Sequence, residues 1–120
     1  EPTGTFIIRS GAWTLVTTVL EDTCGGTPGG SISMAHIVIP SADGQSIVFT
    51  YNTTGTSFVL QRTTGVNVFA GTYNTPSLEG AAAVSVQITF DASGVTYMGT
   101  ESVTHPSGCI VRSVWAGRAD

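Results

Sequence analysis

One glutamate and one arginine in the last third of the chain are the residues best placed to do chemistry. Glu101 and Arg112 each interrupt an alternating apolar pattern, so each is expected on the inner face of a strand. A hairpin centred on Pro106 and Ser107 sets them directly across from one another, and Glu21 flanks the arginine from the other side. Such a group could hold the polar head of a ligand or a proton donor. The simpler interpretation is a cross-strand ion pair that orders two strands and binds nothing.

His36 is the second candidate for chemistry. It shares an alternating face with Met34 and Val38, so the pattern turns it inward, toward Phe49 and Tyr51 of the next strand. A lone histidine on an apolar face is usually a hydrogen-bonded core residue, and contact with a ligand or acid–base catalysis is the alternative. No second histidine or carboxylate stands at the spacing of a metal site, and we expect neither a metal nor another cofactor.

The aromatic side chains could either line an interior cavity or fill it. Eight-stranded barrels have a lumen just wide enough for both outcomes, and the many small residues of this chain favour a partly open lumen. The candidate catalytic residues are Glu101 and His36. The candidate ligand-contacting residues are Met34, His36, Phe49, Tyr51, Phe58, Tyr97, Glu101 and Arg112.

The composition of the 120 residues predicts one all-β domain, 1–120. β-Branched residues are abundant, and no segment keeps the apolar repeat of a helix. Charged residues make up 10% of the chain, lysine is absent, and the net charge is −4. This charge, without a basic cluster, argues against nucleic acid or an anionic membrane as the partner. No apolar run reaches the length of a membrane-spanning helix.

Two cysteines, Cys24 and Cys109, lie far apart in the chain. With a single pair and no Cys-x-x-Cys motif, a disulfide is favoured over a metal site. A disulfide indicates an oxidising compartment, so we expect a secreted or periplasmic protein. The chain begins with Glu1 rather than Met, from which we expect a processed or trimmed form.

Turn-forming residues divide the chain into eight expected strands in an antiparallel meander. A longer loop is expected over 74–82. The alternation is cleanest in 83–91, where Val84, Val86 and Ile88 share one face with Phe90. The expected strands are 11–20, 31–39, 45–52, 56–63, 66–73, 83–91, 95–104 and 109–117.

An up-and-down barrel of eight strands makes the first and last strands antiparallel neighbours. Cys24 follows the first strand and Cys109 opens the last, so their disulfide sets a register that places Leu15 opposite Arg118. Trp13 then lies one residue pair away on the same face. A disulfide at one end and a Trp13–Arg118 contact at the other agree with a single closed barrel. A two-sheet β-sandwich is the main alternative.

Gly11-Ala12-Trp13 resembles the Gly-x-Trp motif at the start of the first strand in lipocalins and their calycin relatives. The resemblance implies a tryptophan that plugs the closed end of the barrel, with a basic residue near the C-terminus packed across its ring. Arg118 matches that residue, and Arg112 is the second choice. Lipocalins are longer and usually have a helix before their last segment, for which this chain has no room. The resemblance therefore implies a calycin-like architecture.

Three kinds of function follow from these observations. The leading hypothesis is a barrel that binds a small, mostly apolar ligand in its lumen, with access at the end that has the loops 21–30, 53–55, 74–82 and 104–108. The first alternative is a small isomerase or cyclase in which Glu101 or His36 is the acid or base and Arg112 tunes it. The second is a protein-binding or inhibitor module that acts through exposed loops, which an exterior apolar patch around an outward-facing Trp115 or the 74–82 loop would favour.

Overall fold

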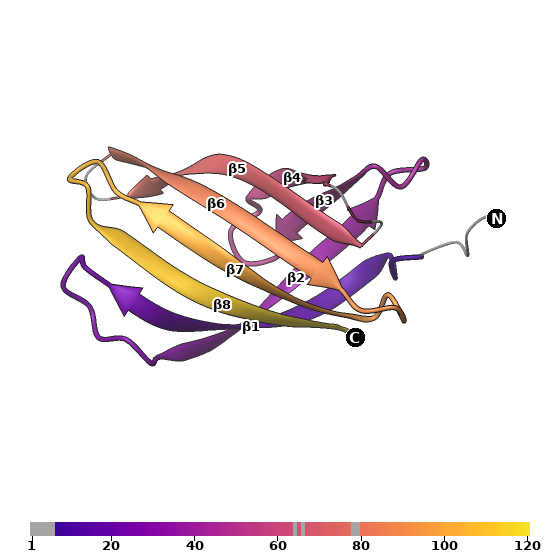
Figure 1. Ribbon diagram of the computed structural model, residues 1–120, viewed down its shortest axis with the longest axis horizontal. Helices are drawn as coiled ribbons and strands as arrows, with labels where there is room; N and C mark the ends of the chain where they lie inside the picture. The colour runs from indigo at the N-terminus through magenta and orange to yellow at the C-terminus, as the bar shows by residue number, and fades with distance from the viewer. Residues whose placement is uncertain (1–6, 64, 66, 78–79) are drawn as a thin grey trace.

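Eight antiparallel strands in chain order close into a barrel (Figure 1). The computed structural model describes residues 7–63, 65, 67–77 and 80–120. Apolar residues alternate with polar ones along most of the strands, so each strand buries one face in the barrel and exposes the other. The strands are β1 (Gly11–Asp22), β2 (Ser31–Pro40), β3 (Ser46–Tyr51), β4 (Ser57–Arg62), β5 (Val68–Ser77), β6 (Gly80–Phe90), β7 (Thr96–Thr104) and β8 (Ile110–Ala119).

The predicted all-β, eight-stranded up-and-down barrel is confirmed, and the two-sheet sandwich is wrong. The longer loop expected over 74–82 is also wrong. β5 continues to Ser77 and β6 begins at Gly80, because residues 74–77 pair in register with residues 80–83. Pairing between the two strands outweighs the low strand propensity of the Asn, Pro and Ser residues that suggested a loop. The predicted start of the fifth strand, Val66, lies outside the described residues.

β1 and β8 pair along most of their length and close the barrel. The predicted disulfide is confirmed, because Cys24 and Cys109 are bonded with an S–S distance of 2.05 Å. The two cysteines are 85 residues apart, and closing a loop of that length stabilises the fold by about 4–5 kcal/mol on the chain-entropy account. A bulge between Val19 and Glu21 shifts the register along β1. Leu15 therefore faces Gly117 instead of Arg118.

The turn between β7 and β8 decides which face of β8 points inward. Pro106, Ser107 and Gly108 form a three-residue loop, in which the Gly108 N–H donates to the His105 carbonyl oxygen at 2.8 Å. Gly108 has a φ of 95°, and a three-residue hairpin loop needs such a residue. The hairpin centre expected at Pro106 and Ser107 is therefore off by one register position.

A register shift of one residue turns every side chain of a strand to the other face. In the structure, Glu101 pairs with Ser113, and Arg112 pairs with Ser102. Trp115 is buried inside the barrel, and Arg112 is exposed outside it. The expected inward position of Arg112 is thus wrong, whereas the inward positions of the apolar faces of β3 and β6 are confirmed.

The end of the barrel that contains Trp13 is packed with rings. Trp13 is fully buried, stacks on Tyr97 with ring centroids 5.4 Å apart, and meets the edge of Phe90 at 5.7 Å. Its indole Nε1 donates a hydrogen bond to the Arg9 carbonyl oxygen at 2.8 Å. This bond ties the segment that precedes β1 to the closed end of the barrel.

No arginine covers the indole ring in the way that the resemblance implied for Arg118 or Arg112. Arg118 pairs with Thr14, is exposed, and lies on the outer face of the barrel, whereas Trp13 points inward. Arg112 is outside as well. The expected Trp13–Arg118 closure is therefore wrong, and the bulge in β1 that shifts the register is the physical reason.

Gly117 faces the ring of Tyr97 so closely that a Cβ atom would lie 2.2 Å from it. We predict that Gly117→Ala lowers the free energy of unfolding by about 1–3 kcal/mol, because the Tyr97 ring is buried between Trp13 and His36 and has no room to move. Urea unfolding followed by tryptophan fluorescence measures the loss. Gly30→Ala is the control, since a Cβ at Gly30 meets no atom within 4 Å. Equal losses in the two variants would contradict the prediction.

Candidate ligand-binding site

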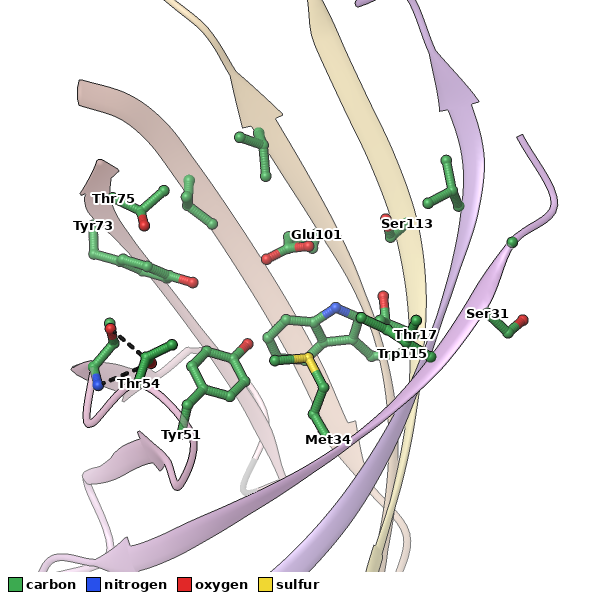
Figure 2. A pocket seen from close by; sticks show the side chains of 16 residues that line it. Thr17, Ser31, Met34, Tyr51, Thr54, Tyr73, Thr75, Glu101, Ser113 and Trp115 are labelled. Carbon is green, nitrogen blue, oxygen red and sulfur yellow. Dashed lines mark hydrogen bonds between the residues drawn. The ribbon is translucent and has the colours of Figure 1, made fainter. Parts of the chain in front are cut away.

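The end of the barrel opposite Trp13 contains a cavity of about 530 Å³ (Figure 2). Gly30, Thr54 and Thr75 lie on it, so it is at the end that the meander predicted for access. Cavities of ~300–1,000 Å³ are typical of small-molecule sites. The described residues that line it are Thr17, Val19, Gly30, Ser31, Ile32, Met34, Tyr51, Thr54, Thr56, Tyr73, Thr75, Val84, Glu101, Val103, Ser113 and Trp115.

The cavity is open because several inward positions at this end have short side chains. Thr17, Thr75 and Ser113 face it from β1, β5 and β8. In the packed end, β1 and β5 place Trp13 and Phe69 at inward positions. The change from large to small residues along the same strands leaves one end of the lumen filled and the other empty.

Aromatic rings form the floor of the cavity. Tyr51 and Trp115 lie edge to face with ring centroids 6.5 Å apart, and Phe49 packs against Trp115 at 5.6 Å. Tyr73 stacks on Phe58 with centroids 4.1 Å apart and nearly parallel planes. Because core rings hold Tyr73 and Trp115 from the packed side, the floor is apolar and preformed.

Glu101 is the one formally charged residue among the described residues of the cavity wall. Its carboxyl group lies between the Trp115 indole and the hydroxyl of Tyr73 (Figure 2). Burial raises the pKa of the Glu101 carboxyl above its ordinary value, and the nearby Trp115 indole N–H lowers it in part. The Trp115 Nε1 atom is nevertheless buried and makes no hydrogen bond to any described residue. The site therefore combines the Glu101 carboxyl group, which has no cation among the described lining residues, with the Trp115 indole N–H, which has no described acceptor.

Two phenol groups point into the same space from β3 and β5 (Figure 2). Burial raises the pKa of Tyr73 to about 12, and the charge of Glu101 contributes to the rise. Burial raises the pKa of Tyr51 as well, again with contributions from Tyr73 and Glu101. Both phenols are neutral near neutral pH, where each can donate and accept a hydrogen bond.

The structure brings together three of the predicted ligand-contacting residues, Met34, Tyr51 and Glu101. Four more point inward as expected but are buried in the packed part of the lumen, beneath the cavity floor. These are His36, Phe49, Phe58 and Tyr97.

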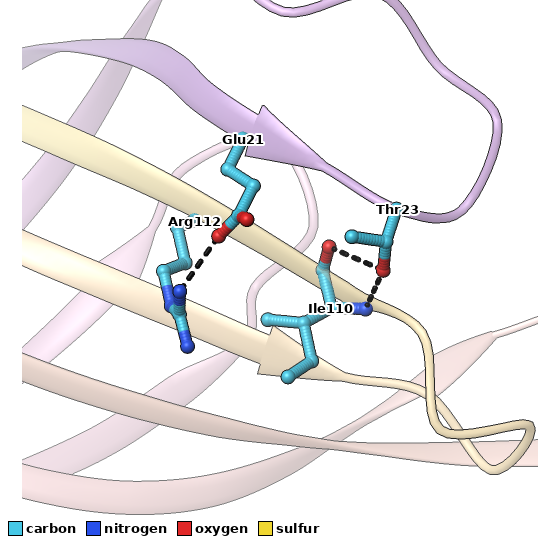
Figure 3. A network of polar contacts seen from close by, with 4 residues as sticks. All are labelled: Glu21, Thr23, Ile110 and Arg112. Atoms are coloured by element: carbon cyan, nitrogen blue, oxygen red, sulfur yellow. Dashed lines mark hydrogen bonds and ion pairs between the residues drawn. The ribbon is translucent and has the colours of Figure 1, made fainter.

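Arg112 is outside the barrel and forms an ion pair with Glu21 at 2.6 Å (Figure 3). Next to it, the Thr23 hydroxyl accepts a hydrogen bond from the Ile110 N–H at 2.7 Å. The Glu21–Arg112 contact is as expected, but the predicted carboxylate–guanidinium–carboxylate group is wrong, because Glu101 faces the lumen. An ion pair this exposed contributes little stability. The contacts link β1 to β8 on the outside of the barrel, so they form no part of the cavity.

His36 is a core residue. It is fully buried and stacks on Phe49 with ring centroids 4.2 Å apart. A neutral ring with its proton on Nδ1 accepts a hydrogen bond from the Tyr97 hydroxyl at Nε2, at 3.0 Å, and faces the Met34 carbonyl oxygen at 3.4 Å. Burial lowers the pKa of His36 to about 4. The ring is thus neutral near pH 7 and has no described contact with the cavity.

Trp115, Tyr73 and Ser113 line the cavity but were not among the predicted site residues. Tyr73 could have been predicted from the sequence, because it alternates with Phe69 along one expected strand and so shares its inward face. For β8, the alternation of Ser113, Trp115 and Gly117 was as regular as that of Ile110, Arg112 and Val114. Only the conformation of the preceding turn distinguishes the two faces.

No protein-family model matches the chain, and no curated protein matches its sequence. The closed eight-stranded antiparallel barrel is compatible with the calycin-like architecture that Gly11-Ala12-Trp13 implied. Function is therefore inferred from the cavity and its residues.

Within the described ranges, no three His, Cys, Asp or Glu side chains gather into a group that could hold a metal ion. The same ranges contain no helix with the length and apolar character needed to cross a bilayer. The groups that the described lining residues can offer a ligand are aromatic rings, hydroxyl groups and one carboxyl group.

Glu101 should make stability depend on pH. A carboxyl group with a raised pKa binds its proton more tightly in the folded state, so the folded state loses stability as the pH rises above the ordinary value of 4.5. Glu101→Gln removes this loss. We predict that its melting temperature exceeds that of the wild type by a margin that grows as the pH rises above 4.5. Glu21→Gln, which removes an exposed carboxylate, should show only a small margin, and a pH-independent margin for Glu101→Gln would refute the assignment.

His36 should make the stability of the fold depend on pH in the opposite sense, so that stability falls as the pH falls. Its pKa falls from 6.5 to about 4 on folding, so the stability that the neutral ring contributes is present above pH 6.5 and is lost as the pH falls toward 4. We predict that the melting temperature of His36→Phe falls less over this range than that of the wild type. Loss of the Tyr97 hydrogen bond lowers the stability of the variant equally at every pH. The slopes of melting temperature against pH can therefore still be compared between the variant and the wild type. Parallel slopes would show that His36 does not titrate on unfolding.

Proposed function

We propose that this protein binds a small, mostly apolar molecule in the cavity. The observation that carries the proposal is the unfilled volume of about 530 Å³ above rings that the packed core already holds in place. Burial of apolar ligand surface against such a floor is favourable in proportion to the area removed from water. A preformed floor also lowers the ordering cost of binding.

The composition of the wall from floor to rim supports the proposal. Tyr51, Tyr73 and Trp115 supply large ring surfaces at the floor, whereas Thr54 and Thr56 at the rim are short and polar. Small-molecule sites have this combination of apolar surface and a few placed polar groups.

Binding is favoured over catalysis by the titratable groups of the wall. An isomerase or cyclase that uses acid–base chemistry must both remove and deliver a proton. Glu101 is the one carboxyl or imidazole group among the described lining residues, and the phenols of Tyr51 and Tyr73 have raised pKa values. His36, the other catalytic candidate, lies beneath the floor.

The protein-binding alternative loses the apolar patch expected around Trp115, although Ile39, Val48 and Val59 are exposed side by side on the outer face of β2, β3 and β4. The patch that is lost was expected around an outward-facing Trp115 or around the 74–82 loop. Trp115 is 2% exposed and points into the lumen, and residues 74–77 pair with residues 80–83 in the sheet. The Cys24–Cys109 disulfide favours an oxidising compartment. We place the binding activity in a secreted or periplasmic setting on that basis.

The test of this function is titration with N-phenyl-1-naphthylamine, a neutral apolar fluorophore that brightens when it leaves water. We predict saturable one-to-one binding that also quenches tryptophan emission. Val103→Trp should weaken binding at least tenfold, because Val103 lines the cavity and is only half-buried, so the larger ring fills the volume. Thr104→Trp is the matched control, since the neighbouring residue is exposed on the outer face. The absence of saturable binding, or equal weakening by both variants, would overturn the proposed function.

A further inference from the structure

The charge distribution between the inside and the outside of the barrel restricts the kind of ligand that the cavity can hold. Glu101 is inside, and the described lining residues include no arginine or histidine. Arg9, Arg112 and Arg118 are exposed, and the whole chain has a net charge of −4. A ligand with a carboxylate or phosphate head would meet a carboxyl group and find no cation to pair with.

We propose that the ligand is a protonated amine on an apolar body, with its ammonium group held between the carboxylate of Glu101 and the rings of Tyr51, Tyr73 and Trp115. This inference rests on the proposed function and names its ligand class. The four side chains face one space in the cavity, from β3, β5, β7 and β8 (Figure 2).

The rings suit a cation because they line the cavity, and core rings cover Tyr73 and Trp115 from the packed side. Phe58 covers one face of Tyr73 at a centroid distance of 4.1 Å, and Phe49 packs against Trp115 at 5.6 Å. The parts of Tyr73 and Trp115 that these core rings leave uncovered line the cavity. A cation near such surfaces is attracted by the ring quadrupole, most strongly where water is excluded.

The hydrogen-bonding groups suit an ammonium head as well. An ammonium has three N–H donors, and the Glu101 carboxylate with the Tyr51 and Tyr73 hydroxyl oxygens offers acceptors that face one space (Figure 2). The buried Trp115 Nε1 has no described hydrogen-bond partner and lies next to the Glu101 carboxyl group (Figure 2). Once Glu101 is ionised by pairing with a cation, this N–H can donate to the carboxylate. A cationic ligand therefore completes a set of groups that is incomplete without it.

A neutral ligand is less well matched. It would leave the half-buried carboxyl group without a counter-charge, and burial of an unpaired charge is unfavourable. Burial raises the pKa of Glu101, and the described lining residues include no cation that would lower it.

The test uses three probes with the same body and different heads: 4-phenylbutylamine, 4-phenylbutan-1-ol and 4-phenylbutanoate. Each is titrated near neutral pH into the full chain by calorimetry and by displacement of N-phenyl-1-naphthylamine. We expect the amine to bind at least tenfold tighter than the alcohol and the carboxylate to bind weakest. Glu101→Gln should bring the ratio of amine affinity to alcohol affinity close to one. Glu21→Gln makes the same change of charge outside the barrel and should keep the preference.

The outcomes separate the two proposals. If the fluorophore and the alcohol bind but the amine is not preferred, the ligand class is wrong and the proposed function stands. The ligand class is also wrong if Glu21→Gln weakens amine binding as much as Glu101→Gln does, because the effect then comes from net charge alone. If the fluorophore and all three probes fail to bind the wild-type protein, both proposals fall. The affinities of the amine, the alcohol and the carboxylate for the wild-type protein are compared without any variant. They therefore test the ligand class even if a substitution impairs folding.

Discussion

Closure of the barrel by β1 and β8 is the constraint on which the rest of the structure depends. A closed sheet has no free edge, so every strand has two partners and every side chain is either inside or outside. The register of each pair then decides which residues share the lumen. At the β1–β8 junction, the bulge after Val19 and the bond between Cys24 and Cys109 set this register. Glu21 turns outward to Arg112 as a result.

The lumen is divided because the inward residues change in size along the strands. Trp13, Tyr97, His36 and Phe49 form a continuous set of stacked and hydrogen-bonded rings in the closed end. This packed end supports the floor of the cavity above it, where the inward threonines and serines are too short to fill the space. The burial that stabilises the fold and the unfilled volume that can receive a ligand thus lie on the same inner faces of the same strands.

The charges are separated by the same wall. The arginines with exposed side chains interact with solvent or, for Arg112, with Glu21, whereas Glu101 remains in the lumen among aromatic rings. In water a carboxylate is well solvated, and in a partly buried site it needs either a proton or a cation nearby. Glu101 is therefore the residue at which the chemistry of the cavity differs most from that of a simple apolar pocket.

The sequence by itself determined the all-β class, the order of eight antiparallel strands, the disulfide and the inward faces of β3 and β6. These features depend on local alternation, turn residues and the two cysteines, which are properties of short segments. Only the tertiary structure decided the inner face of β8, because the alternation there fits both faces and the conformation of Gly108 selects one. It also decided that Trp115 belongs to the cavity and Arg112 does not. The reason is physical: a shift of one residue in a turn or bulge costs little locally, yet it reverses the side of the wall on which every later side chain lies.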